Sequence, residues 1–313
     1  MLDDLATIVA HCYRDGEGSA RANGWEVEEV TRGSNGIVFR VRSDAEDLAA
    51  KVSQLDERDR AGRELAAFEL LARRRVAVAP EPKGVVRSPD GVPVAVLFAG
   101  WRSGAPVKKP PEPEAPVWRP ILEAYAAVHR VELDGTALRP AMLGVDVQQV
   151  VEDMRARARL NGDTASEPLI DAAAGSLEPT LSTSRARRLV HCDANLANVL
   201  LDGERTTIVD WENSGWGDPC FDVANIVMTP QLADRSLAEW EPLFVAHAEL
   251  LGDAALADRT RAHARLMAAW WVVRLRQELT APTPRLPGVA RFRDSSTKER
   301  LALCEQRAHA LFG

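Results

Sequence analysis

One short polar motif in the second half of the chain combines residue types that can orient a nucleophile and bind a cation. It spans residues 191–198 (HCDANLAN), and Asp210 follows twelve residues after its last member, Asn198. Amide and carboxylate oxygens are ligands that a hard cation such as Mg²⁺ prefers. Asn198 and Asp210 are therefore candidate metal ligands, and Asp193 is a candidate for orienting a reacting group.

A predicted hairpin gives this spacing a structural meaning. Apolar segments at 199–201 and 206–209 lie on either side of the turn signal Asp202-Gly203, which predicts two short antiparallel strands. Their pairing would place the flanking residues, Asn198 and Asp210, side by side at the open end of the hairpin. Two oxygen ligands would then face one metal ion.

These groups suit the transfer of a phosphoryl group. Such a reaction depends on positioning the two reactants and on neutralising the charge of the phosphates, and it needs little covalent chemistry from the protein itself. We expect Asp193 to hydrogen-bond an attacking hydroxyl and to accept its proton late in the reaction. Asn198 and Asp210 would hold the metal ion that bridges the phosphates.

The first hundred residues, which must help to position such a site, have mostly the pattern of strands. Segments 25–32 and 37–42 alternate apolar and polar residues, and 48–53 reads as a third strand. The period then changes to helical spacing, so 57–74 predicts an amphipathic helix. The apolar run 92–101 predicts a buried strand, since a membrane span needs roughly 20 residues.

The remainder of the chain reads as mainly helical. Residues 105–116 include five prolines and predict an exposed connection. Helices are expected at 117–131, at 145–160 and in several pieces from 232 to the C-terminus. The predicted fold class is α+β, with a small antiparallel β-rich lobe that carries one key helix and a larger, mainly helical lobe.

The 191–198 motif and the segment 209–212 (VDWE) together resemble the active site of the aminoglycoside phosphotransferases and their choline-kinase-like relatives. They correspond to the catalytic loop and metal-binding Asp of protein kinases, with departures that favour the small-molecule branch. The resemblance implies a bilobal protein-kinase-like fold, with a nucleotide-binding lobe at 1–100 and a catalytic, substrate-binding lobe at 101–313. It also implies that ATP and Mg²⁺ are used and that a hydroxyl group accepts the phosphate.

The same resemblance implies roles for residues in the first lobe. In this fold a lysine on the third strand grips the α- and β-phosphates, and a glutamate on the next helix holds it; Lys51 and Glu64 match in order and spacing. The turn between the predicted strands at 25–32 and 37–42 would cover the phosphates through Ser34, Asn35 and Gly36. The last strand should end in a hinge whose backbone groups bind adenine, at Phe98, Ala99 and Gly100.

Neighbouring residues receive mostly structural interpretations. In some relatives the Asp-x-Glu pair supplies a further metal ligand, so Glu212 is either a metal ligand or a salt-bridge partner, and both remain open. Asp222 is expected to brace the catalytic loop from a following helix, with His191 organising that loop. Cys192 is interpreted as a small buried residue, and His129 as a helix-packing residue.

Composition excludes several other classes of protein. The formal net charge is −7 with both signs mixed along the chain, which argues against a nucleic-acid-binding surface and permits a cationic substrate. The four cysteines lie far apart without a CxxC pair, as in a reduced cytosolic protein. The N-terminus lacks the features of a secretory signal. We therefore expect a cytoplasmic protein that binds neither membranes nor nucleic acids.

Three questions stay open at this point. The acceptor could be an aminoglycoside-type antibiotic, or a metabolite such as choline, ethanolamine or a sugar-like compound. A catalytically inactive pseudokinase that serves as a binding module is a second hypothesis. The complete polar set argues against it: Lys51, Glu64, Asp193, Asn198 and Asp210 are all present. A metal-dependent hydrolase is less well supported, because His191 and Asp193 have no further His or Cys at metal-ligand spacing.

Overall fold

The computed structural model describes residues 1–33, 36–107, 110–133, 138–177, 187–203, 205–280 and 295–313. Contacts divide this part of the chain into two compact units. The sheet unit comprises Met1–Gly104 together with Thr207–Glu212, and the helical unit comprises most of the rest. The segment Thr207–Glu212 therefore packs with residues that lie more than a hundred positions earlier.

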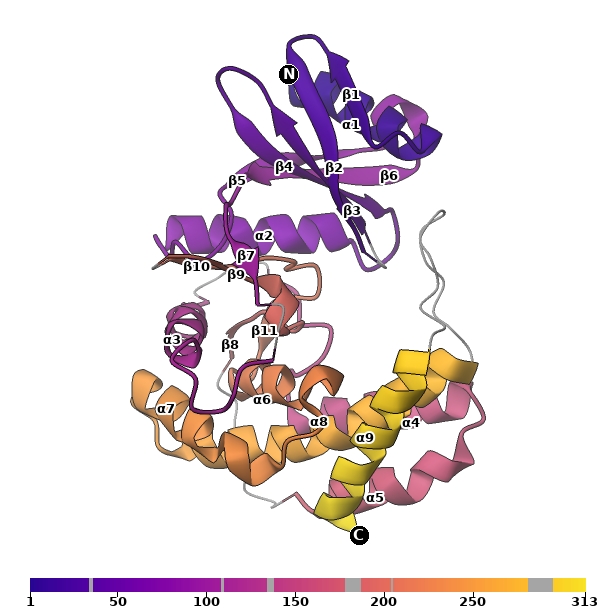
Figure 1. Cartoon of the computed structure of the whole chain (residues 1–313), viewed down its shortest axis with the longest axis vertical. Coiled ribbons are helices and arrows are strands. Elements are labelled where there is room, and N and C mark those ends of the chain that lie inside the picture. Colours follow the sequence, from indigo (N-terminus) through magenta and orange to yellow (C-terminus); the bar gives the residue numbers. More distant parts are fainter. Residues whose placement is uncertain (34–35, 108–109, 134–137, 178–186, 204, 281–294) are drawn as a thin grey trace. The chain divides into compact units, whose positions relative to one another are not determined.

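A six-stranded antiparallel sheet with strand order β1-β2-β3-β4-β6-β5 is the framework of the sheet unit (Figure 1). Its strands are β1 (Ser19–Ala22), β2 (Trp25–Arg32), β3 (Gly36–Arg42), β4 (Asp47–Gln54), β5 (Pro82–Arg87) and β6 (Val94–Gly100). A 3₁₀ turn, η1 (Pro89–Gly91), joins the last two strands. The strands predicted at 25–32, 37–42 and 48–53 are confirmed to within one residue at each end, and the α+β class with an antiparallel sheet is confirmed.

Two helices complete the sheet unit. Helix α1 (Leu2–Asp15) was not predicted; its residues Leu5 and Val9 are buried in the same apolar core as the strands. Helix α2 (Arg60–Arg73) begins three residues later than predicted. Asp59 has a left-handed backbone with φ of 48°, which an α-helix cannot include. The chain therefore enters the helix only after this residue.

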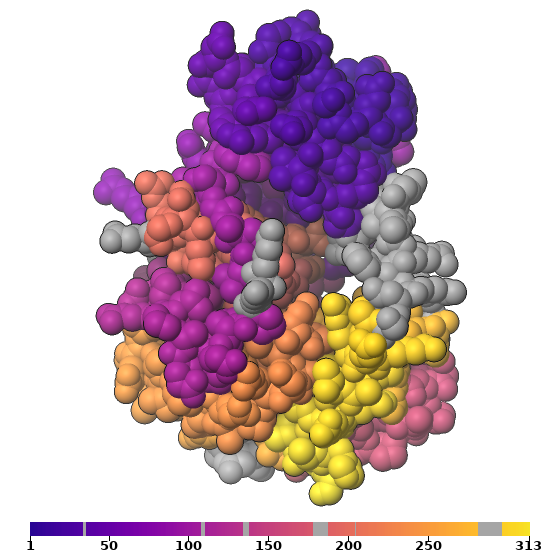
Figure 2. Space-filling model, in the orientation of Figure 1, coloured from indigo at the N-terminus to yellow at the C-terminus, as the bar shows by residue number. Residues whose placement is uncertain are grey.

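The helical unit is organised around α8, which is 26 residues long. Helices α4, α5, α6, α7 and α9 all pack against it (Figure 1). Figure 2 shows α9, in yellow, forming part of the surface of this unit. The α-helices are α3 (Trp118–His129), α4 (Val147–Leu160), α5 (Glu167–Gly175), α6 (Cys220–Met228), α7 (Glu241–Leu251), α8 (Ala255–Thr280) and α9 (Ser295–Phe312). Short 3₁₀ helices are η2 (Thr164–Ser166), η4 (Leu196–Asn198), η5 (Pro230–Leu232) and η6 (Leu237–Trp240).

Short strands accompany these helices. They are β7 (Ala105–Pro106), β8 (Arg188–Val190), β9 (Val199–Asp202), β10 (Arg205–Ile208) and β11 (Gly215–Gly217). Strand β11 pairs with β8, and the other three form a sheet of order β10-β9-β7. The two strands predicted around Asp202-Gly203 are present as β9 and β10. The predicted connection at 105–116 is corrected at its start, because β7 pairs with β9 there.

Within the described residues, every helix is too short or too polar to cross a bilayer.

Candidate active site

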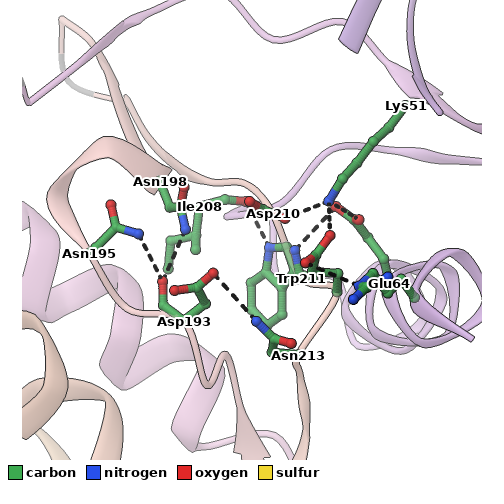
Figure 3. Close-up of polar contacts among 11 residues, drawn as sticks. Lys51, Glu64, Asp193, Asn195, Asn198, Ile208, Asp210, Trp211 and Asn213 are labelled. Carbon is green, nitrogen blue, oxygen red and sulfur yellow. Dashed lines mark hydrogen bonds and ion pairs between the residues drawn. The ribbon is translucent and has the colours of Figure 1, made fainter. Parts of the chain in front are cut away.

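A buried charge cluster in the sheet unit is centred on Lys51 of β4 (Figure 3). The Lys51 amino group lies 2.8 Å from Glu64 Oε2 and 3.1 Å from Glu212 Oε2, and it also forms an ion pair with Asp210. The backbone N–H of Trp211 donates to the second oxygen of Glu64, over 3.1 Å. Glu64 therefore binds both the strand lysine and the 210–212 segment, and the Lys51–Glu64 pair predicted from the sequence is present.

The elements of the sheet unit explain why these groups meet. Lys51 is in the middle of β4, where it pairs on both sides with strand residues, and Glu64 is on the buried face of α2. Asp210 has a left-handed backbone with φ of 67°, a conformation that Asp adopts more readily than most residues. Strained backbone of this kind concentrates at functional sites.

The cluster brings three carboxylates to one lysine. Glu64, Asp210 and Glu212 all face Lys51, and Arg60 Nε lies 3.6 Å from Glu212 Oε1. Burial raises the pKa of Glu64 to about 7, opposed by Lys51 and assisted by Asp210. Burial disfavours the charged form of Lys51, but the carboxylates outweigh it and hold the lysine pKa well above its usual value.

Carboxylates of this cluster could also bind a divalent cation. Asp210 is 37% exposed, whereas Glu212 is 1% exposed and already paired with Lys51 and Arg60. Among the described residues, no three or more His, Cys, Asp and Glu side chains are arranged as a ready-made metal site. Mg²⁺ is usually held by one or two carboxylates together with substrate phosphates. Of these carboxylates, Asp210 is the most accessible to a metal ion. The contacts of Glu212 with Lys51 and Arg60 match the salt-bridge interpretation.

In the helical unit, Asp193 is held by three asparagine side chains (Figure 3). Asn198 Nδ2 donates to the Asp193 carbonyl oxygen over 3.0 Å, and Asn195 Nδ2 lies 3.5 Å from the same oxygen. Asn213 Nδ2 donates to the carboxylate itself, at Oδ2, over 3.4 Å. Sequence reasoning missed Asn213, although it is one residue beyond the Asp-Trp-Glu element.

Asp222 of α6 fixes the backbone just before Asp193, as predicted. Its two carboxylate oxygens accept the backbone N–H groups of His191 and Cys192, each over 2.8 Å. Cys192 has a left-handed backbone with φ of 64°, which is costly for a side chain of this type. Its thiol is buried and bonded to the Leu143 carbonyl oxygen over 3.0 Å, so the structural interpretation of Cys192 is confirmed.

The predicted phosphate-covering turn is described only in part, because Ser34 and Asn35 lie outside the described residues. Gly33 N–H donates to the Gly36 carbonyl over 2.8 Å and closes the turn. A Cβ on Gly36 would lie 2.9 Å from the Val52 carbonyl oxygen and 3.4 Å from Lys51 Cε. Glycine is therefore needed at position 36, where β3 begins next to the Lys51 side chain.

Several backbone groups of the predicted adenine-binding hinge are already hydrogen-bonded. Phe98 and Ala99 are paired within the sheet on both sides of β6. The Gly100 N–H donates to the Glu81 carbonyl over 2.8 Å. The contacts with adenine proposed for Phe98, Ala99 and Gly100 stay predictions. The approach of Asn198 to Asp210 also stays a prediction, since these residues belong to different units.

The fold is that of a protein-kinase-like phosphotransferase. Each unit holds part of the predicted polar set: the Lys51–Glu64 pair with the 210–212 segment in one, and Asp193 with Asn198 in the other. The family model described as the phosphotransferase enzyme family matches residues 26–265. The chain belongs to this family, which is that of the aminoglycoside phosphotransferases. A comparison of the sequence with curated proteins gives no match.

Solved structures show the same fold. A protein from Ralstonia eutropha JMP134, provisionally classed as an aminoglycoside phosphotransferase, is 16% identical with a TM-score of 0.65, over 97% of this chain and 96% of that one. A choline/ethanolamine kinase family protein from Mesorhizobium loti is 21% identical with a TM-score of 0.60, over 98% and 95%. A thermostable mutant of the aminoglycoside phosphotransferase APH(4)-Ia, in complex with ADP and hygromycin B, is 16% identical with a TM-score of 0.62, over 92% and 94%.

Proposed function

We propose that this phosphotransferase is an ATP- and Mg²⁺-dependent kinase that phosphorylates a hydroxyl group of a small molecule. The observation that carries the proposal is the buried Lys51 cluster, in which Glu64, Asp210 and Glu212 all face the lysine. Such a cluster is costly to bury and is explained if Lys51 contacts the phosphates of ATP. Asp210 and Asn198 would hold Mg²⁺, with Glu212 as a second candidate. When bound, the ion would neutralise phosphate charge.

Other residues would have separate roles in positioning the acceptor and the nucleotide. Asp193 would hydrogen-bond the acceptor hydroxyl and take its proton, and Asn213 would keep the carboxylate in one orientation through its bond to Oδ2. Glu64 would hold the Lys51 ammonium in place. Gly36 would let the phosphate-covering turn, with Ser34 and Asn35, approach the phosphates. Adenine would bind the backbone near Phe98, Ala99 and Gly100.

For the acceptor we propose an aminoglycoside-type antibiotic, with choline, ethanolamine or a sugar-like metabolite as the alternative. One similar structure contains hygromycin B, and another belongs to the choline/ethanolamine kinase family. The net charge of −7 suits a cationic acceptor such as an aminoglycoside, choline or ethanolamine. The use of ATP would place the enzyme in the cytoplasm.

A screen for acceptor-stimulated ADP release tests the proposal. The purified protein is incubated with Mg·ATP and with panels of aminoglycosides, amino alcohols and sugars. We expect at least one aminoglycoside to stimulate ADP release above the basal hydrolysis rate. Stimulation only by amino alcohols would support the alternative acceptor class. ATP binding without any stimulated turnover would overturn the kinase proposal and favour the pseudokinase alternative.

A further inference from the structure

A line of three buried ionisable side chains runs through the helical unit to the backbone next to Asp193. His247 of α7 lies 3.0 Å from His129 of α3, measured from Nε2 to Nδ1. The other ring nitrogen of His129, Nε2, lies 3.0 Å from Asp222 Oδ2 on α6. The side chains of His129 and Asp222 are 0% exposed, and His247 is also 0% exposed. Sequence reasoning gave His129 only a packing role.

The Asp222 carboxylate receives three hydrogen bonds. Two come from the catalytic-loop backbone, and the third comes from His129 Nε2. Burial alone would raise the pKa of Asp222, but the bond from His129 and the nearby imidazoles hold it below its usual value. The ionised carboxylate can accept all three donors at once. His129 therefore helps to maintain the form of Asp222 that holds the loop.

The second histidine determines which nitrogen of His129 carries the proton. Burial, with His129 beside it, lowers the pKa of His247 to about 3, so His247 is neutral and has one N–H. Among the described residues, His247 Nδ1 is buried without a hydrogen-bond partner. A buried N–H without an acceptor is rarer and costlier than a bare lone pair. The N–H of His247 is therefore at Nε2, where it donates to His129 Nδ1.

We propose that His247 and His129 are positioning residues that act through Asp222 to hold the strained backbone before Asp193. His247 fixes His129 in the tautomer that donates to Asp222, and Asp222 holds the His191 and Cys192 amides. The effect on turnover rests on the proposed kinase function. The hydrogen-bond chain itself does not, and this difference lets the two be tested separately.

Substitutions at His247 test the chain, because they leave Asp222 and His129 in place. The His247→Leu variant removes the donor, and His247→Gln keeps an amide N–H that can replace Nε2. His263→Leu is the matched control: His263 is also 0% exposed, and its Nε2 lies 3.3 Å from Asp218, a carboxylate that accepts the Cys220 amide. It removes an equally buried imidazole bonded to a different carboxylate.

With an acceptor found in the screen, we expect His247→Leu to lower kcat about tenfold, the effect of roughly one hydrogen bond on the barrier. KM for ATP should change less than twofold. His247→Gln should recover most of the lost kcat, and the control should keep kcat within twofold. Equal kcat in wild type and His247→Leu, no rescue by glutamine, or the same loss in the control would overturn the proposal.

Nuclear magnetic resonance tests the chain in the unmodified protein, whatever the variants do. The ¹⁵N shifts of the His129 ring should show a protonated Nε2 and an unprotonated Nδ1. The His191 and Cys192 amides should exchange with solvent faster in His247→Leu than in wild type. A proton on His129 Nδ1 would overturn the proposed tautomer. A protein with the expected shifts but no phosphate transfer to any acceptor would keep the chain and refute only the kinase function.

Discussion

Replacing Lys51 by methionine is expected to destabilise the protein far more than the loss of an ordinary lysine. The substitution keeps much of the side-chain length and removes the one ammonium group among three carboxylates. Glu64 and Glu212 are 4% and 1% exposed, so water cannot replace the lost partner. Removal of one partner from a buried ion pair costs roughly 3–5 kcal/mol, and we expect a loss of that size in the free energy of unfolding.

The loss should depend on pH in a direction that the pKa of Glu64 determines. Because that pKa is raised to about 7, the folded protein binds a proton more tightly than the unfolded chain does. The contribution of Glu64 to stability therefore falls as pH rises from its ordinary pKa of 4.5 towards 7. Lys51 lowers the pKa of Glu64, so this pKa rises further in the variant that lacks the lysine. The deficit of the variant should consequently be largest above pH 7 and should shrink as pH falls.

Urea unfolding at several pH values between 5.5 and about 8 measures this effect. Lys83→Met is the control, since Lys83 is partly exposed and lies 3.4 Å from the exposed Glu81; it should cost less than about 1 kcal/mol. Mg²⁺ should recover part of the stability of Lys51→Met, because it can bind the partly exposed Asp210. A Lys51→Met variant as stable as the control, or a deficit that grows as the pH is lowered, would refute the reasoning.

Three further substitutions test individual contacts. Asn213→Ala removes a hydrogen bond to the Asp193 carboxylate. It should lower kcat about tenfold and leave KM for ATP unchanged. An unchanged kcat in steady-state kinetics would contradict the role of Asn213. Gly36→Ala places a Cβ 3.4 Å from Lys51 Cε. It should weaken ATP binding severalfold, as measured by titration calorimetry. An unchanged affinity for ATP would contradict the proposed phosphate-covering turn. Glu212→Gln should lower thermal stability but leave the Mg²⁺ concentration for half-maximal activity within twofold; a large rise would make Glu212 a metal ligand.

Contacts that depend on order along the chain could be predicted from the sequence. Lys51 and Glu64 lie on consecutive elements, and the pairing of that strand and helix is typical of the fold. Asp222 follows its motif at a fixed short distance, and its bonds to the loop are as expected. In these cases the type of element and the spacing were enough to determine which side chains meet.

Contacts between distant helices could not be predicted in this way. His247 is 118 residues from His129, and only the packing of α7 on α3 brings them together. Nothing in the local pattern distinguishes His247 from a histidine that faces the core. Helix α1 is different, because Leu5, Val9 and Cys12 recur at helical spacing and are buried. That signal was present in the sequence and indicates an amphipathic helix.

The central claim is that Asp193 directs the transfer of phosphate from ATP to an acceptor hydroxyl. Single-turnover ³¹P nuclear magnetic resonance of the wild type and of Asp193→Asn, with Mg·ATP and the best acceptor from the screen, tests it most directly. We predict one phosphate ester per ADP in the wild type and, in the variant, a rate at least about a thousandfold lower with ATP affinity unchanged. Equal ester formation by both proteins, or ADP with free phosphate and no ester in the wild type, would contradict the account.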